Sequence, residues 1–393
     1  MSEFTPPIDA TKEVRSPGRI AYGRGATAEL TEFVTEQSAD SVLLVTDPGV
    51  HDAGATDAVV EALEDARVDV SVFTGVRSEP KLSMPVEAAQ HVCEAGHDLV
   101  VGCGGGSSMD TAKLAGVLAD HPVPIEDVLG MDNVPGDGRP VALLPTTAGT
   151  GSEVTHIGVF ADPDDGAKRV VYSPHLFADL AILDPDLTAS MPPHVAAATG
   201  LDALTHAIES YVSMHRTPYT DTLARRAIEL IGNNLRPVVH QGRRHHEARY
   251  RMLLGSMLAG QAFVNSGLGA VHALTYPIGI RFDLGHGEAN AMLLAPVMRY
   301  NLPADRQRFA EIGRLLTGED SGPEEAVDAV EHLTEEVGIP PGIGHLGPLD
   351  ESDFASFADM AMTYSEHNIE RNPRQLDRDD IIEIYWQAYE REE

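Results

Sequence analysis

The sequence predicts two domains: an α/β domain built on a parallel β-sheet, followed by an all-helical domain. Three observations support this prediction. The chain has 393 residues, more than one simple hydrophobic core usually organises. Short apolar runs alternate with helical stretches up to about residue 190. Beyond that point the spacing of apolar residues is helical throughout, and no second strand-rich region follows.

The first part of the α/β domain contains two predicted strands and two predicted helices. Residues 41–47 form a short apolar run that ends at a Pro-Gly turn, as a buried strand does. A helical stretch covers residues 55–66, and residues 68–76 are rich in strand-forming residues. Another helix begins at Ser83 and has Pro85 in its first turn, where proline is favoured.

The second part of this domain adds three strands, the first of them buried, and a hairpin. Residues 157–160 and 169–172 flank the turn-rich segment Asp162–Gly166, which predicts the hairpin. Strands that alternate with helices in this way form a parallel sheet with helices on both faces. The three strands are residues 98–102, 141–145 and 178–183.

The second domain begins after Pro192-Pro193. Helical periodicity runs from His194 to the end of the chain and is interrupted by Gly and Pro. We therefore expect an α/β domain over residues 1–190 and an all-helical domain over residues 191–393.

The charge of the chain limits its partners. Asp and Glu number 61 and Lys and Arg 28, which gives a net charge of -33. This field repels nucleic acid and anionic membranes, so neither is an expected partner. The acids are dispersed, and the chain contains only four lysines. These features suggest a protein from a high-salt cytoplasm, where counter-ions screen self-repulsion. An ordinary acidic enzyme is the alternative, but it leaves the scarcity of lysine unexplained.

The compartment expected from the sequence is a reducing cytoplasm. The chain has only Cys93 and Cys103, too few for a disulfide scaffold. Residues 1–19 are polar and contain Asp9 and Glu13, unlike a secretory signal. No apolar run is long enough to span a bilayer.

A triple-glycine loop joins a predicted strand to a helix at Gly104-Gly105-Gly106. Glycines let backbone amides approach a pyrophosphate, and a helix N-terminus supplies positive potential. Ser107 and Asp110, which follow, have the spacing of a capping box. The loop lacks the third glycine of the dinucleotide fingerprint, so a tight turn that binds nothing explains it equally well.

A second loop, residues 145–155, also follows a strand and interleaves Gly with Ser and Thr. Alone it favours a structural role, but ligands bind at the carboxyl ends of strands in such sheets, so two such loops favour a site. Asp47 ends an early strand, where an acid can accept a hydrogen bond from a ribose 2′-hydroxyl and repel a 2′-phosphate. Its position beside Pro48-Gly49 also suits a simple turn.

Four residues of the second domain have the chemistry of a metal site. Asp202 and His206 are four apart in a helical segment and share a face. His272 lies in an apolar segment, and His286 lies between two glycines. Three imidazoles and a carboxylate suit Fe(II) or Zn(II). By spacing alone, the first two also suit a surface pair, and His272 a buried core histidine.

Across nearly its whole length, from about Arg15 to Glu390, the chain resembles the iron-containing (type III) alcohol dehydrogenase family. The segments that carry the resemblance are Gly104–Lys113, Pro145–Thr155, Ala181–Pro193 (AILDPDLTASMPP), Gly200–Ser210 (GLDALTHAIES), His272–Pro296, and the C-terminal Asn372-Pro373-Arg374 with Asp379-Asp380-Ile381 and Ile384-Tyr385.

The resemblance implies a Rossmann-like first domain, a helical second domain, and a site for a nicotinamide cofactor and one divalent metal. NAD(H) is favoured over NADP(H), and Fe(II) is the favoured metal, with Zn(II) as the alternative. It also implies a homo-oligomer, a dimer or larger. The implied metal ligands are Asp202, His206, His272 and His286. The implied cofactor-binding residues are Asp47, Gly105, Gly106, Ser107, Asp110, Thr146, Thr147, Thr150 and Lys168.

Two positions depart from the family pattern. Members often carry a second histidine four residues after the ligand at His272, as a proton relay, and here that residue is Tyr276. Tyrosine transfers protons but ordinarily titrates near pH 10, so the relay is altered or replaced by solvent. An asparagine commonly precedes the proline of the loop before the glycine motif, and here Glu79 precedes Pro80.

The expected activity is the interconversion of small alcohols and aldehydes or ketones. A metal that acts as a Lewis acid would polarise the substrate oxygen while a hydride moves between the nicotinamide and carbon.

Three other functions compete with this expectation. The first is a reductase or transhydrogenase of a hydroxy or oxo acid, similar to maleylacetate reductase, for which Arg281 is the candidate cation. The second is a lyase similar to dehydroquinate synthase, which would need more Lys and Arg. The third is a non-catalytic nucleotide-binding protein, against which the complete ligand set argues.

If the acidic surface is an adaptation to salt, the unfolding midpoint should rise between low and molar KCl, because counter-ions screen the repulsion among carboxylates. Thermal melts over that range measure it, and a midpoint that falls with salt would contradict the adaptation.

Overall fold

The structure, a computed structural model, describes residues 11–162 and 168–390. The chain divides into two compact units between Met191 and Pro192, and the described residues 11–14 group with the second unit. No helix among the described residues is long and apolar enough to cross a membrane.

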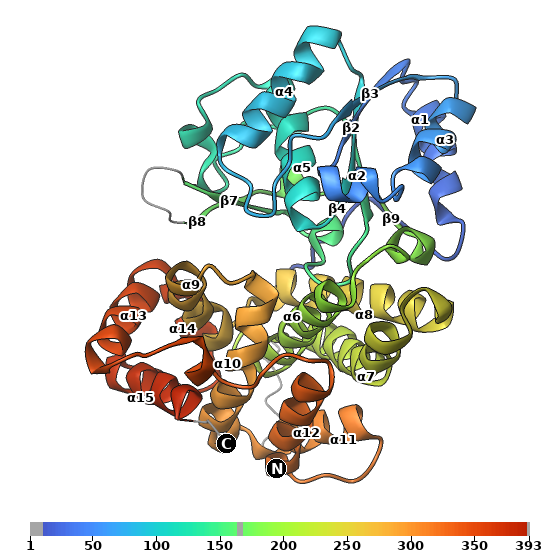
Figure 1. Cartoon of the computed structure of the whole chain (residues 1–393). Coiled ribbons are helices and arrows are strands. Elements are labelled where there is room, and N and C mark those ends of the chain that lie inside the picture. Colours follow the sequence, from blue (N-terminus) through green and yellow to red (C-terminus); the bar gives the residue numbers. More distant parts are fainter. Residues whose placement is uncertain (1–10, 163–167, 391–393) are drawn as a thin grey trace. The chain divides into compact units, whose positions relative to one another are not determined.

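The first unit contains a six-stranded sheet in the order β1-β9-β6-β4-β2-β3, and every adjacent pair is parallel (Figure 1). The parallel sheet predicted from the sequence is thus confirmed. The strands are β1 (Arg19–Tyr22), β2 (Ser41–Val45), β3 (Asp69–Phe73), β4 (Leu99–Gly104), β6 (Val141–Pro145) and β9 (Leu180–Leu183).

Two layers of helices cover this sheet because its central strands are apolar on both faces. Leu43 and Val45 of β2 lie in the same core as α4 (Ser83–Ala95) and α5 (Gly106–Asp120), while Val42 and Leu44 lie in the core with α1 (Glu29–Glu36) and α3 (Asp57–Asp65). A one-residue slip of β2 would exchange its two faces, because successive side chains point to opposite sides of the sheet. The register matters because full burial of each such side chain contributes about 1.5–3 kcal/mol. Figure 1 shows the two pairs of helices on opposite sides of the sheet.

The predicted hairpin is also present. Strands β7 (Ile157–Ala161) and β8 (Lys168–Tyr172) pair antiparallel, and β5 (Gly130–Met131) pairs parallel with β8. Most of the predicted turn, Pro163–Gly166, lies outside the described residues. The sequence did not predict β1, a four-residue strand at the edge of the main sheet, whose residues are only partly buried or exposed.

The order of the strands places the loop after β2 beside the loop after β4. β2 neighbours β3 on one side and β4 on the other, so the chain changes direction across the sheet between β2 and β4. Asp47 follows β2, and Gly105 and Gly106 follow β4, whose last residue is Gly104. A point where the strand order reverses is where open α/β sheets bind ligands, outside the carboxyl ends of the strands.

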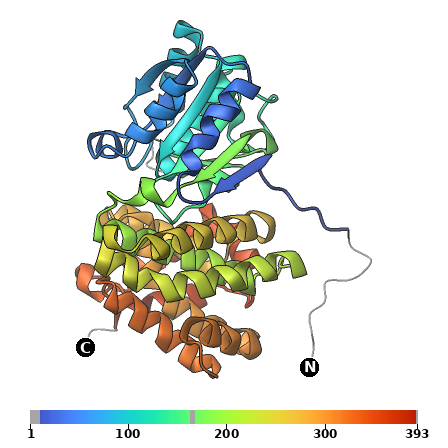
Figure 2. The same cartoon turned by 90° about the vertical axis from the view of Figure 1, so that its right-hand side faces the viewer.

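The second unit is helical, as predicted, and is organised around α6 (Pro193–Val212). Proline at its first position has no amide hydrogen to leave unpaired, and every residue from Gly200 to Val212 is buried. It packs against α7 (Pro218–Gln241), α8 (His246–Ser266) and α10 (His286–Asn301). Figure 2 shows α7 and α8 lying alongside one another. The remaining helices are α9 (Ala270–Phe282), α11 (Arg306–Thr317), α12 (Pro323–Glu336), α13 (Glu351–Tyr364), α14 (Glu366–Arg371) and α15 (Arg378–Tyr389).

Candidate metal centre and cofactor loops

Asp202 and His206 lie one turn apart on α6 and face the interior. Their exposed fractions are 3% and 4%, so the alternative of a surface pair is wrong. His206 Nε2 lies 3.7 Å from Asp202 Oδ1. A carboxylate is buried at a cost of several kcal/mol unless it is paired, so this one needs the partners that surround it.

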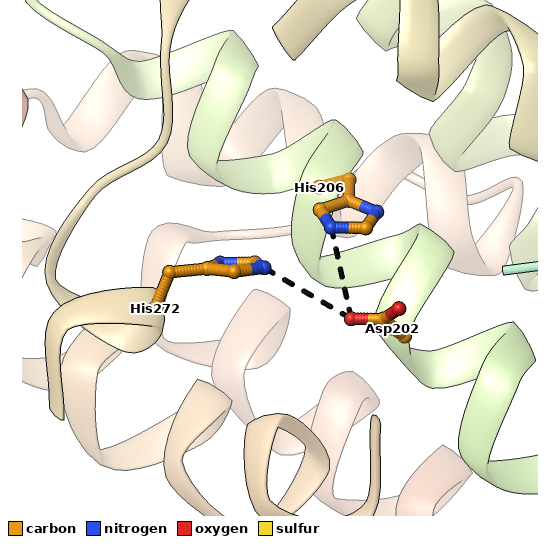
Figure 3. Close-up of side chains that lie close together, drawn as sticks. All are labelled: Asp202, His206 and His272. Atoms are coloured by element: carbon orange, nitrogen blue, oxygen red, sulfur yellow. Dashed lines mark ion pairs between the residues drawn. The ribbon is translucent and has the colours of Figure 1, made fainter. Parts of the chain in front are cut away.

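A second helix brings His272 to the same carboxylate. His272 lies in the first turn of α9, and its Nε2 is 3.9 Å from Asp202 Oδ1. Its ring stacks on that of His206 with 4.8 Å between the centroids. Figure 3 shows both imidazoles directed at one Asp202 oxygen from two different helices.

His286 completes the predicted set from a third helix. It is the first residue of α10, its Nε2 lies 3.9 Å from Asp202 Oδ1, and its side chain is 40% exposed. Gly287 permits this approach, because a Cβ there would lie 2.5 Å from the Ala198 carbonyl oxygen of α6.

The four predicted ligands fit a divalent metal. Tetrahedral ligands with bonds of about 2.1 Å stand about 3.4 Å apart, and the three imidazole nitrogens lie 3.7–3.9 Å from Asp202 Oδ1. Small movements of the side chains would close this difference. Burial opposes the charge of Asp202, but the imidazoles and the Asn290 amide outweigh it and hold the pKa of the carboxyl below its ordinary value.

Two residues that the sequence did not predict, Glu209 and Asn290, contact these ligands, and a third, Thr275, contacts Asn290. Glu209 Oε2 lies 2.6 Å from His272 Nδ1. Asn290 Nδ2 donates to Asp202 Oδ1 at 2.7 Å, and the Thr275 hydroxyl donates to Asn290 Oδ1 at 2.6 Å. Helical spacing was the available signal: Glu209 is three residues after His206, and Asn290 is four after His286.

Tyr276, the predicted proton relay, lies one turn after His272 on α9 and is half-buried. Its ring packs edge-on against Tyr364 of α13, with 5.8 Å between the centroids. The Tyr276 ring is therefore held on the same face of α9 as His272, one turn further along the helix.

Arg281, the candidate cation for an oxo-acid substrate, is placed differently. It lies nine residues after His272, which at about 100° per residue is the opposite side of α9. Its side chain is exposed and its guanidinium packs 5.4 Å from the centroid of Phe282. A reductase or transhydrogenase of a hydroxy or oxo acid, the first of the competing activities, therefore lacks its candidate cation on the His272 side of α9.

The glycine loop leaves the N-terminus of α5 open. Gly104 has a φ of +156°, a region that favours glycine, and a Cβ there would lie 2.5 Å from Ser108 Oγ. The expected capping box is wrong: α5 begins at Gly106 with no side-chain cap, and the Ser107 hydroxyl donates to the Ser78 carbonyl at 2.8 Å. Uncapped backbone amides at a helix N-terminus suit an anionic pyrophosphate.

Asp110, predicted to bind the cofactor, has both carboxylate oxygens bonded within the protein. Oδ1 accepts from the Ser152 hydroxyl at 2.5 Å and pairs with Lys113 Nζ at 2.8 Å, and Oδ2 accepts from the Val159 amide at 3.0 Å. Lys113 is fully buried and also donates to the carbonyls of Ser152 and Ile157 at 3.1 and 2.6 Å. This buried network ties the glycine-loop helix to the second loop and to β7.

The second loop touches the first. A Cβ on Gly106 would lie 2.9 Å from Thr150 Cγ2, and one on Gly105 would lie 3.8 Å from Thr147 Oγ1. The Thr146 amide donates to the Gly104 carbonyl at 2.9 Å.

A buried acid also lies in the second loop, at Glu153. Burial raises the pKa of its carboxyl to about 7, against the opposing effects of its own backbone amide and Lys113.

The two remaining cofactor predictions flank these loops. Asp47 caps α2 (Pro48–Asp52) by accepting from the Val50 amide at 3.0 Å through Oδ1, while Oδ2 lies 3.5 Å from where a Cβ on Gly104 would be. It therefore serves the turn and also faces the glycine loop. Lys168 Nζ lies 3.8 Å from Glu79 Oε1, so the residue that departs from the family pattern is an ion-pair partner of the predicted cofactor lysine.

Replacing Gly287 with alanine should weaken metal binding, because the new Cβ forces α10 and His286 away from α6. We expect a loss of about 1–3 kcal/mol in stability and a higher metal dissociation constant, measured by calorimetric titration. Gly285→Ala is the matched control, because nothing lies within 4 Å of a Cβ there. Equal metal affinity in both variants would contradict this packing argument.

Comparisons with known proteins identify the family of this chain. The iron-containing alcohol dehydrogenase model matches residues 17–185, and the model of the Fe-containing alcohol dehydrogenase family, C-terminal, matches residues 196–389. The chain is 42% identical over 376 residues to long-chain-alcohol dehydrogenase 1 of Geobacillus thermodenitrificans, covering 93% of this chain and 94% of that protein.

Solved structures are similar along almost the whole chain. A 1,3-propanediol oxidoreductase matches with a TM-score of 0.92 and 35% identity, covering 96% of this chain and 100% of that one. Sulfoacetaldehyde reductase from Bifidobacterium kashiwanohense, in complex with NAD+, matches with a TM-score of 0.89 and 29% identity, covering 98% and 100%. The chain therefore belongs to the iron-containing alcohol dehydrogenase family of metal-dependent, nicotinamide-linked oxidoreductases that act on alcohols and aldehydes.

Proposed function

We propose that this enzyme interconverts small alcohols and aldehydes or ketones with one divalent metal held by Asp202, His206, His272 and His286, and with NAD(H). The observation that carries the proposal is the approach of three imidazole nitrogens to within 3.7–3.9 Å of one buried carboxylate oxygen. Nitrogen and oxygen donors without a thiolate suit Fe(II), which we favour, and also Zn(II). When bound, such an ion supplies Lewis acidity to a substrate oxygen.

The chain's own residues supply binding and orientation. We assign the pyrophosphate to the backbone of Gly105, Gly106 and Ser107 at the open N-terminus of α5. Asp110 acts on this loop indirectly, since both its oxygens bond within the protein. The other predicted cofactor contacts are Thr146, Thr147, Thr150 and Lys168.

NAD(H) is favoured over NADP(H) because the Asp47 carboxylate faces the glycine loop, where it would accept from a ribose 2′-hydroxyl and repel a 2′-phosphate. The NAD+ complex of the 29% identical sulfoacetaldehyde reductase supports the same cofactor.

We also propose a homo-oligomer, a dimer or larger, in a reducing cytoplasm of high ionic strength. The net charge of -33 and the four lysines support the salt environment, and the two free cysteines support the reducing one. Light scattering in molar KCl tests the oligomer, and a monomeric mass would refute it.

Metal-stripped enzyme should lose turnover and regain it with Fe(II), and less fully with Zn(II). The assay is a panel of alcohols, aldehydes and one oxo acid, each run with NADH or NAD+ and with NADPH or NADP+ on protein of known metal content. The panel should include long-chain alcohols, because the 42% identical relative is named a long-chain-alcohol dehydrogenase. We expect aldehydes to exceed the oxo acid, and NADH to exceed NADPH. Full activity in protein shown to be free of metal would refute the proposal.

Replacing Tyr276 with phenylalanine should lower turnover by roughly 10²-fold and shift its pH profile, because it removes the hydroxyl that we propose as the proton relay and keeps the ring contact with Tyr364. Tyr364→Phe is the control, since it removes the hydroxyl of the outer ring of the same pair. An unchanged pH profile in the Tyr276 variant would exclude a relay role.

A further inference from the structure

We propose that Glu209 is a positioning residue that holds His272 in the tautomer whose Nε2 is free to bind the metal. This inference rests on the proposed metal site and concerns a residue outside it. Glu209 lies on α6, seven residues after Asp202 and three after His206, so the three side chains emerge from one face of the helix.

Glu209 is a buried carboxylate without a strong cation beside it. Its exposed fraction is 4%, and within the part of the chain that the structure describes no lysine or arginine pairs with it. Its partners are two N–H groups at the start of α9. Oε1 accepts from the Val271 amide at 2.6 Å, and Oε2 lies 2.6 Å from His272 Nδ1.

The position of these partners explains how the charge is tolerated. Val271 is the second residue of α9, where backbone amides have no partner inside the helix, and Gly269 at the N-cap has no side chain to supply one. A carboxylate at this end of a helix is also stabilised by the helix dipole. The neighbouring amide of Ala270 donates its hydrogen bond to a different acceptor, Asn372 Oδ1, at 3.3 Å.

The same contact determines where the proton of His272 resides. A carboxylate can only accept hydrogen bonds, so Nδ1 must carry the hydrogen and Nε2 must carry the lone pair. A second contact points to the same tautomer. Asn290 directs its amide nitrogen at Asp202 Oδ1, and that nitrogen lies 3.2 Å from His272 Nε2, where only an acceptor is compatible with it. Such partners commonly orient metal-binding histidines.

Two acceptors are required at Glu209, and only a carboxylate provides both. In Glu209→Gln the amide offers one oxygen and one NH₂ group. If its oxygen keeps the Val271 amide, its NH₂ faces His272 Nδ1 and favours the tautomer with hydrogen on Nε2. If the side-chain amide of the glutamine is rotated by half a turn, its NH₂ group faces the Val271 amide. The variant thus preserves size and either the helix cap or the tautomer, but not both.

The experiment titrates metal-free full-length protein with Co(II), followed by visible absorption and calorimetry. We expect the dissociation constant of Glu209→Gln to be about 10–100-fold above wild type. In protein labelled with ¹⁵N at histidine, the His272 ring should be protonated at Nδ1 in the wild type and shift towards Nε2 protonation in the variant.

Two controls separate this role from general destabilisation. Glu331→Gln alters another buried glutamate of the same unit, paired with Arg299 at 2.5 Å, and should lower the melting temperature without changing Co(II) affinity. Asn372→Ala removes the other side-chain acceptor at the start of α9 and should also leave the His272 tautomer unchanged.

The outcomes are distinguishable. Wild-type affinity and tautomer in Glu209→Gln, with only a lower melting temperature, would overturn the proposal and leave Glu209 as a helix cap. If the glutamine variant does not fold, Glu209→Asp decides: it keeps both acceptors but is one carbon too short for both contacts, and Co(II) affinity equal to wild type would overturn the proposal. Failure of the wild type to bind Co(II) would instead refute the metal site on which the inference rests.

Discussion

The burial of one carboxylate, Asp202, is the constraint on which the helical unit depends. A charge removed from water is costly unless polar partners surround it, and here they come from three helices. α6 contributes His206, α9 contributes His272, and α10 contributes His286. Gly287 lets α10 approach α6 closely enough, and Glu209 connects α6 to the start of α9. The arrangement that compensates the charge is also the one that brings together the four proposed metal ligands.

A different constraint, the close approach of side chains to the backbone of the glycine loop, organises the α/β unit. Gly104 and Gly106 leave no room for a Cβ against Ser108 and Thr150, so the glycine loop packs against its neighbours through backbone atoms. The buried Asp110–Lys113 pair then joins this loop to the one after β6, through Ser152. These contacts hold the uncapped N-terminus of α5 at the point where the strand order reverses.

Much of the fold could be predicted from sequence, because fully buried strands leave short apolar runs and amphipathic helices leave a helical periodicity. β1 leaves no such run, because its residues are only partly buried or exposed at the sheet edge. The spacing of Asp202 and His206 was visible, but their burial was not, since burial depends on helices that arrive from distant sequence. Glu209 shows the same limit: its helical spacing was available, yet its partner His272 lies 63 residues away. Ser107 and Asp110 suggested a capping box, but tertiary contacts with Ser78 and Ser152 took both side chains instead.

The most direct test of the metal centre is anomalous diffraction from crystals of the Fe(II)- or Co(II)-loaded enzyme. The account predicts one strong peak, with Asp202 Oδ1 and the Nε2 atoms of the three histidines each about 2.0–2.3 Å from it. A peak elsewhere in the molecule, or a peak at this position from which Asp202 or any of the three histidines is turned away, would contradict the account.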